Sequence, residues 1–92
     1  MTIPLRLAVC LFPGVTALDY QGPIEVLGFL SPKRLGSTMR GRFPEPPPYS
    51  LETSYLSHNL EPVEPISGPL VLPNALYTTT DQYDIILVPG GM

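Results

Sequence analysis

Two short apolar segments, each followed directly by a proline–glycine turn, constrain the fold of this chain most. Residues 5–12 (LRLAVCLF) and 85–88 (IILV) are apolar at nearly every position instead of alternating with polar residues. A β-strand with this pattern is covered on both faces, as in a parallel α/β sheet. Pro13-Gly14 and Pro89-Gly90-Gly91 end the two segments, because proline removes a ladder donor and glycine permits a tight turn. We therefore predict two central strands, adjacent and parallel.

A helix is predicted directly after the first strand. Thr16 is followed three residues later by Asp19, which is a variant of the capping box, and an apolar face continues at helical spacing to Leu30. Gly22-Pro23 is expected to kink or restart the helix, because proline cannot donate to the preceding turn. Strand, turn and helix together form the first half of a βα unit.

The rest of the chain predicts a small sheet. Residues 49–55 alternate and are rich in β-formers, which indicates a third strand with one more polar face. Residues 62–66 and 70–72 are expected to form a short hairpin at a sheet edge, and residues 74–82 a loop. This order of elements favours an α/β sandwich with a mainly parallel sheet.

Length, charge and cysteine usage narrow the class of protein. Ninety-two residues allow one domain at most, and the net charge of −3 offers no general attraction to nucleic acid or anionic membranes. No apolar run approaches the roughly 18–20 residues of a membrane helix, and the start does not resemble a secretory signal. The single cysteine excludes an internal disulfide and fits a reducing compartment. We expect a cytoplasmic protein without nucleic-acid or membrane partners.

Residues 31–48 differ in composition from the rest. They hold four of the five basic side chains, several prolines and two glycines. This composition predicts a loop insertion that ends in an extended proline spacer. A solvated insertion is favoured over a cationic patch for an anionic ligand.

The candidate chemistry lies where the two apolar strands end. Ligands of parallel sheets bind beyond the carboxyl ends of the strands, near the point where the strand order reverses. Asp19 and the backbone N–H groups of Gly90 and Gly91 can face one pocket there, and such N–H groups can stabilise a developing oxyanion. The alternatives are an ordinary acid in a first helical turn and glycines that only form a turn. Cys10 is interpreted as a core residue, and His58 has no neighbour that indicates a metal site.

Two sequence stretches resemble one known family. Residues 9–27, with the pattern Leu-Phe-Pro-Gly-Val-Thr-x-Leu-Asp-x-x-Gly-Pro-x-Glu-Val-Leu, resemble the amino-terminal strand and helix of the ThiJ/PfpI superfamily, which has the class I glutamine-amidotransferase-like fold. Residues 83–91 resemble its later strand and glycine turn. The Asp-x-x-Gly-Pro form looks most like the isonitrile hydratase branch and the related ligand-sensing domains of AraC-type regulators. The resemblance covers nearly the whole chain except the insertion.

The resemblance implies a flavodoxin-like α/β sandwich that is incomplete here, with residues 1–92 forming the amino-terminal part of one domain. It implies a small-molecule substrate, a homodimer in the full-length form, and no metal or redox cofactor. The family nucleophile is a cysteine on a strand-to-helix elbow, which would lie beyond Met92. Asp19 would be the catalytic acid, and Gly90 and Gly91 the oxyanion-side backbone.

Three functional hypotheses follow. The chain is part of a cysteine-dependent isonitrile hydratase, a lyase that converts an isonitrile and water to an N-substituted formamide. Alternatively, it belongs to the sensor domain of an AraC-type regulator, or it is an inactive fragment. Three strands and one helix leave much apolar sheet surface uncovered, so the isolated chain is expected to unfold or aggregate.

Overall fold

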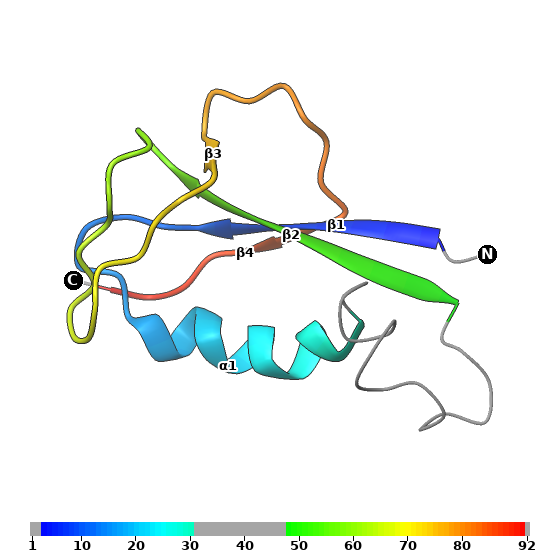
Figure 1. Cartoon of the computed structure of the whole chain (residues 1–92), viewed down its shortest axis with the longest axis horizontal. Helices are drawn as coiled ribbons and strands as arrows, with labels where there is room; N and C mark the ends of the chain where they lie inside the picture. The colour runs from blue at the N-terminus through cyan, green and yellow to red at the C-terminus, as the bar shows by residue number, and fades with distance from the viewer. Residues whose placement is uncertain (1–2, 31–47, 92) are drawn as a thin grey trace.

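The computed structural model describes residues 3–30 and 48–91, which form a parallel four-stranded sheet with a helix against one face (Figure 1). The expected insertion at 31–48 lies outside the described residues except for Pro48. The elements in chain order are β1 (Ile3–Cys10), α1 (Ala17–Leu27), the 3-10 helix η1 (Gly28–Leu30), β2 (Tyr49–Ser57), β3 (Ala75–Leu76) and β4 (Ile85–Leu87).

The strand order β3-β2-β1-β4 confirms that the two apolar segments are parallel neighbours. From β1 the chain passes through α1 to β2 on one side, whereas β4 pairs with β1 on the other side. The direction of strand addition therefore reverses between β1 and β4. This is the switch point at which ligands of open parallel sheets bind.

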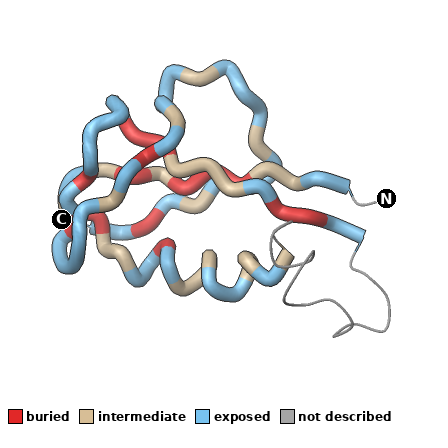
Figure 2. The backbone as a smooth tube through the Cα atoms, viewed as in Figure 1, coloured by how far each residue is buried: buried red, intermediate tan, exposed pale blue. Residues whose placement is uncertain are grey.

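The core lies between α1 and one face of the sheet. Paired residues in a parallel ladder share a face, so the register Leu7↔Thr53 and Leu7↔Ile85 places these side chains on the same side. Leu7 and Val9 have no exposed surface, and Tyr20 of α1 packs in the same cluster. Figure 2 shows that the buried residues concentrate in the middle of β1 and in two parts of β2.

A loop from β3 to β4 crosses the opposite side of the sheet (Figure 1). Arg6, whose side chain alternates away from Leu7, anchors this loop. Its guanidinium lies 3.2 Å from Asp81, donates to the Gln82 carbonyl and stacks 5.0 Å from the centre of the Tyr83 ring. The backbone N–H of Arg6 also donates to the Asp84 carboxylate at 2.9 Å, so the residue before β4 is fixed to β1. These contacts position β4 for pairing.

Three sequence expectations differ from the structure in this region. β4 was expected to be covered on both faces, but it is an edge of the described sheet, and Ile86 and Val88 are 64% and 70% exposed. The expected hairpin is reduced to one antiparallel bridge between Val63 and Val71, because the prolines around it leave few donors for a ladder. The expected loop at 74–82 contains the short strand β3.

The helix also differs from its prediction. α1 is one continuous helix through Pro23, with no break at Gly22. The N-cap is Thr16 as predicted, but its side chain makes no capping hydrogen bond. The expected capping box is therefore wrong, and Asp19 is directed elsewhere. No helix in the described part of the chain is long and apolar enough to cross a membrane.

Because β1 is the centre of the core, truncating its side chains is expected to destabilise the fold most. Leu7→Ala should lower the free energy of unfolding by about 2–5 kcal/mol, since it leaves a cavity in a fully buried position. The matched change Ile86→Ala, on the exposed edge strand, should cost about 0.5 kcal/mol. Urea unfolding measures both. Equal losses at the two positions would contradict this core.

Candidate functional site

The turns after β1 and β4 meet at the carboxyl edge of the sheet. Val15 and Gly91 form an antiparallel bridge, and the Thr16 N–H donates to the Gly90 carbonyl at 2.8 Å. The second glycine turn thus lies against the start of α1. The sequence analysis predicts that the two turns lie next to each other, and these contacts agree with that prediction.

Asp19 points to the glycine turn. Its Oδ2 accepts a hydrogen bond from the Gly90 N–H at 2.9 Å, across 71 positions of sequence, while the residue stays exposed. The first turn of α1 carries the positive end of the helix dipole, which favours a carboxylate there. The Asp19 carboxylate therefore does not serve its own helix alone, because it also binds the turn after β4, which is distant in sequence.

The two glycines have different surroundings. A Cβ on Gly90 would lie 2.8 Å from Asp19 Oδ2. A Cβ on Gly91 would lie 2.6 Å from the Phe12 ring and 2.7 Å from the Gly14 carbonyl oxygen. Both contacts are shorter than carbon atoms tolerate. Glycine is therefore required at position 91, where a Cβ meets the backbone oxygen of Gly14, whereas at position 90 a Cβ would displace the end of the exposed Asp19 side chain.

The structure also shows how the glycine N–H groups are used. The Gly90 N–H holds the Asp19 carboxylate and so does not point freely at a substrate oxygen. Between the described residues, no hydrogen bond uses the Gly91 N–H. In this arrangement the Gly90 N–H fixes the side chain of Asp19.

The turn after β1 is braced from a segment that sequence reasoning assigned only to a hairpin. Gly14 has a φ of 84°, a conformation that favours glycine, and its N–H donates to the Glu64 carbonyl at 2.9 Å. The Ile66 N–H donates to the Val15 carbonyl at 2.9 Å. Residues 64–66 therefore hold the turn that leads into α1.

Cys10 does not lie with Asp19, Gly90 and Gly91. It alternates away from Val9, so it lies on the face of β1 opposite α1, and it is half-buried instead of fully buried as expected. Tyr77, which carried no signal in the sequence, covers it, and the Tyr77 hydroxyl donates to the Leu11 carbonyl at 2.6 Å. Burial raises the pKa of the Cys10 thiol, and a hydrogen bond with Tyr77 lowers it in part. This is not the environment of an activated nucleophile.

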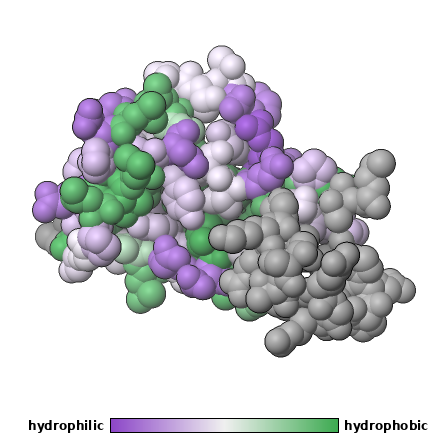
Figure 3. Space-filling model, viewed as in Figure 1, coloured by the Kyte–Doolittle hydropathy of each residue, from purple (hydrophilic) through white to green (hydrophobic). Residues whose placement is uncertain are grey.

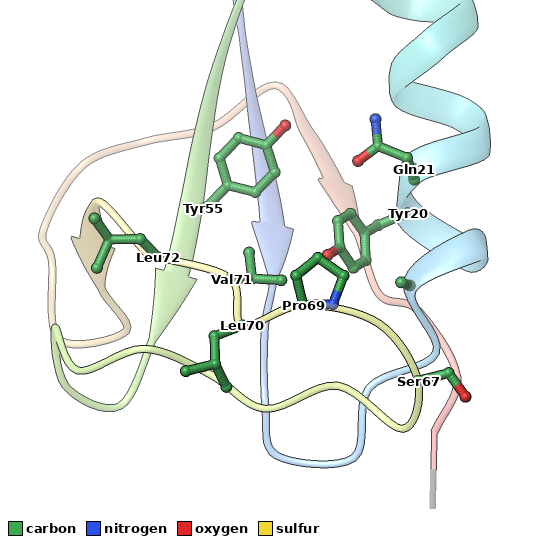
Figure 4. Close-up of a pocket in the computed structure, with 9 residues that line it drawn as sticks. Tyr20, Gln21, Tyr55, Ser67, Pro69, Leu70, Val71 and Leu72 are labelled. Atoms are coloured by element: carbon green, nitrogen blue, oxygen red, sulfur yellow. The ribbon is translucent and has the colours of Figure 1, made fainter.

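A separate pocket of about 480 Å³ lies beside the first turns of α1 (Figure 4). Tyr20 and Gln21 of α1, Tyr55 of β2 and the segment 67–72 surround it. The two tyrosine rings meet edge to face, with centroids 6.4 Å apart. Burial raises the pKa of both hydroxyls. Sequence reasoning missed this pocket, because the residues that form it come from three distant segments.

The described part of the chain offers no built metal site. No group of three or more His, Cys, Asp or Glu side chains gathers among residues 3–30 and 48–91.

The contact between Gly90 and Asp19 predicts a specific mutational coupling. Gly90→Ala should destabilise the fold by about 0.5–1.5 kcal/mol, because the new methyl group displaces the Asp19 carboxylate from its hydrogen bond. Asp19→Ala should relieve part of this cost, so the double variant should be more stable than the sum of the single changes predicts. Gly91→Ala should show no such relief, because it meets the backbone oxygen of Gly14. Denaturant unfolding of the four variants tests this.

Gly22→Ala is the matched control, since a Cβ there meets nothing within 4 Å. This change lies inside α1 and should be neutral or stabilise by about 0.5–1 kcal/mol. Additive costs for Gly90→Ala and Asp19→Ala would show that the two residues do not touch in solution.

The raised pKa values predict a loss of stability at alkaline pH. The pKa of Cys10 is raised above its ordinary value of 9.0, and those of Tyr20, Tyr55 and Tyr77 above 10.0, mainly by burial. The folded state holds these protons more tightly than the unfolded state. Their contribution is therefore complete below about pH 9 and is lost as pH rises through the folded pKa values.

Thermal unfolding between pH 8 and 11 measures this effect. Cys10→Ala should remove the earliest part of the decline, and Tyr55→Phe a later part. A melting temperature that stays constant or rises over this range would contradict the burial of these groups.

Comparison with known proteins supports the fold. No protein-family model and no curated protein matches the chain. A solved structure does: the crystal structure of a ThiJ/PfpI family protein from Pseudomonas syringae superposes with a TM-score of 0.72 at 21% identity. The match covers 98% of this chain and 30% of that chain, so this chain spans less than a third of the neighbour. The predicted flavodoxin-like α/β class, with a mainly parallel and incomplete sheet, is confirmed: over nearly its whole length, the chain has the fold of part of a ThiJ/PfpI family protein.

Proposed function

We propose that this chain forms the amino-terminal part of a ThiJ/PfpI-type enzyme, most like a cysteine-dependent isonitrile hydratase. The observation that carries the proposal is the hydrogen bond between Gly90 and Asp19, which fixes an exposed carboxylate at the switch point between β1 and β4. The likeness to the Pseudomonas syringae protein, which is more than three times as long as the region matched, supports the assignment as one part of a larger domain.

Asp19 is suited to move a proton. One carboxylate oxygen is held by the Gly90 N–H, which fixes the side chain, and the exposed residue can present its other oxygen to a reactant. The same carboxyl group can donate and accept a proton within one cycle when it lies within hydrogen-bond distance of the reacting atoms. The proposed roles are therefore acid and base for Asp19, positioning for Gly90, and oxyanion contact for Gly91.

The thiol of the proposed reaction comes from a segment that follows Met92. Cys10 lies on the opposite face of β1, and burial disfavours its thiolate. In the proposed reaction the incoming thiolate attacks the terminal carbon of the isonitrile, and Asp19 delivers a proton to the adduct. Water then adds across the carbon–nitrogen double bond, with its hydroxyl on the carbon and a proton on the nitrogen. The thiolate leaves as Asp19 takes back the hydroxyl proton, and the product is an N-substituted formamide. Atoms balance as one isonitrile and one water per formamide.

The edge of β4 is consistent with such a continuation. Ile86 and Val88 belong to a strand whose apolar composition is typical of coverage on both faces, yet they are largely exposed. A further strand and its helix would bury them. The elbow that carries the thiol would then stand beside Asp19.

The proposal predicts the activity of the longer protein. It should convert a simple isonitrile such as cyclohexyl isocyanide to the formamide, and Asp19→Asn should lower kcat by about 10²–10⁴ because proton transfer is lost. Cys10→Ser should keep full activity, and residues 1–92 alone should show none. Formamide production measured by mass spectrometry distinguishes these variants.

Two outcomes would contradict the proposal. One is a longer protein without hydratase activity that binds small molecules through the same domain, which would indicate a sensor. The other is activity that depends on Cys10. Asp19→Glu serves as the conservative control, because it keeps a carboxyl group while moving it.

A further inference from the structure

We infer that the pocket between α1, β2 and the segment 67–72 binds a small organic amine with an apolar body. The pocket is open to the surface, and its size of about 480 Å³ falls within the range of small-molecule sites. This site is separate from the proposed active site and does not depend on the proposed function.

The walls are suited to an apolar ring or chain. Pro69, Leu70, Val71 and Leu72 approach from the loop, opposite Tyr20 of α1 (Figure 4). Leu70 and Leu72 are 61% and 71% exposed, and hydrophobic side chains gather at this end of the molecule in Figure 3. A ligand that covered these side chains would remove apolar surface from water.

Two of the polar side chains that line the pocket favour a cation. Tyr55 and Gln21 face each other from β2 and α1 (Figure 4). The Gln21 side chain donates to the Glu25 carboxylate at 3.1 Å, so a negative charge lies directly behind the amide. Glu25 also acts on the Tyr55 hydroxyl electrostatically. Tyrosine rings attract an ammonium group through their faces, and the carboxylate adds its charge.

The charges that the structure describes near the pocket favour a cation over an anion. Arg6 is the one lysine or arginine among the residues that the structure describes, and it lies on the other face of the sheet, bound to Asp81. No described lysine or arginine is thus available to neutralise a carboxylate or phosphate in the pocket. With the Glu25 carboxylate behind Gln21 and apolar walls around it, the inferred ligand class is a primary or secondary amine with an aromatic or aliphatic body.

The pocket and Asp19 lie on opposite sides of the same helical turn. Residues two apart in a helix project about 200° from each other, so Asp19 points away from Ala17 and Gln21, which line the pocket. A ligand here does not contact the acid. The site is a second binding site on the domain.

Three probes of similar size test the inference: benzylamine, benzyl alcohol and benzoate. NMR titration of the full chain should shift the signals of Tyr20, Tyr55, Leu70 and Leu72. Benzylamine should bind about two- to fivefold more tightly than benzyl alcohol, and benzoate most weakly. Glu25→Gln should abolish the advantage of benzylamine and leave benzyl alcohol unchanged. Glu52→Gln, an exposed carboxylate on the other face of the sheet, should change neither.

A second pair of variants tests the location. Leu70→Ser should weaken both benzylamine and benzyl alcohol about threefold or more, because it removes part of the apolar wall. Leu60→Ser, at an exposed leucine outside the pocket, should not. The inference is overturned if benzoate binds as well as benzylamine, if Leu60→Ser and Leu70→Ser act alike, or if no probe shifts these signals.

Discussion

The parallel pairing of β1 with β4 is the constraint on which the rest of the structure depends. It brings together two chain segments that are about 80 positions apart and ends both at one edge of the sheet. The Asp84 carboxylate and the Arg6 backbone begin this pairing, and the bridge between Val15 and Gly91 ends it. A parallel ladder cannot form from a local turn, so this register depends on contacts made across the whole chain.

That pairing places opposite requirements on neighbouring residues. Gly91 must lack a side chain so that the turn can reach the start of α1, because a Cβ there would meet the Gly14 carbonyl oxygen. The Asp19 carboxylate lies beside this turn and accepts a hydrogen bond from the Gly90 N–H. The same few residues therefore determine how the glycine turn packs and where the Asp19 carboxylate lies. A substitution that changes this packing also moves the carboxylate.

The side chains in the first turns of α1 face two separate surfaces of the molecule. One side carries Asp19 toward the glycine turn, and the other carries Tyr20 and Gln21 toward the loop and β2. The loop from 62 to 72 contributes to both sides, because its first part braces Gly14 and Val15 and its second part forms the pocket wall. An α-helix in this position can therefore present side chains to two separate surfaces.

The sequence by itself determined the class of fold and the place of the acid. The uniform apolar strands, the Pro-Gly turns and the residue Asp19 are local signals, and the switch-point rule connects them. Only the tertiary structure decided that β4 lies at an edge, that Thr16 makes no side-chain cap and that Gly90 donates to Asp19. It also decided that Tyr77 covers Cys10 and that residues 67–72 form a pocket wall. Hydrophobic periodicity reports which residues are buried, whereas hydrogen-bond partners distant in sequence leave no periodic signal.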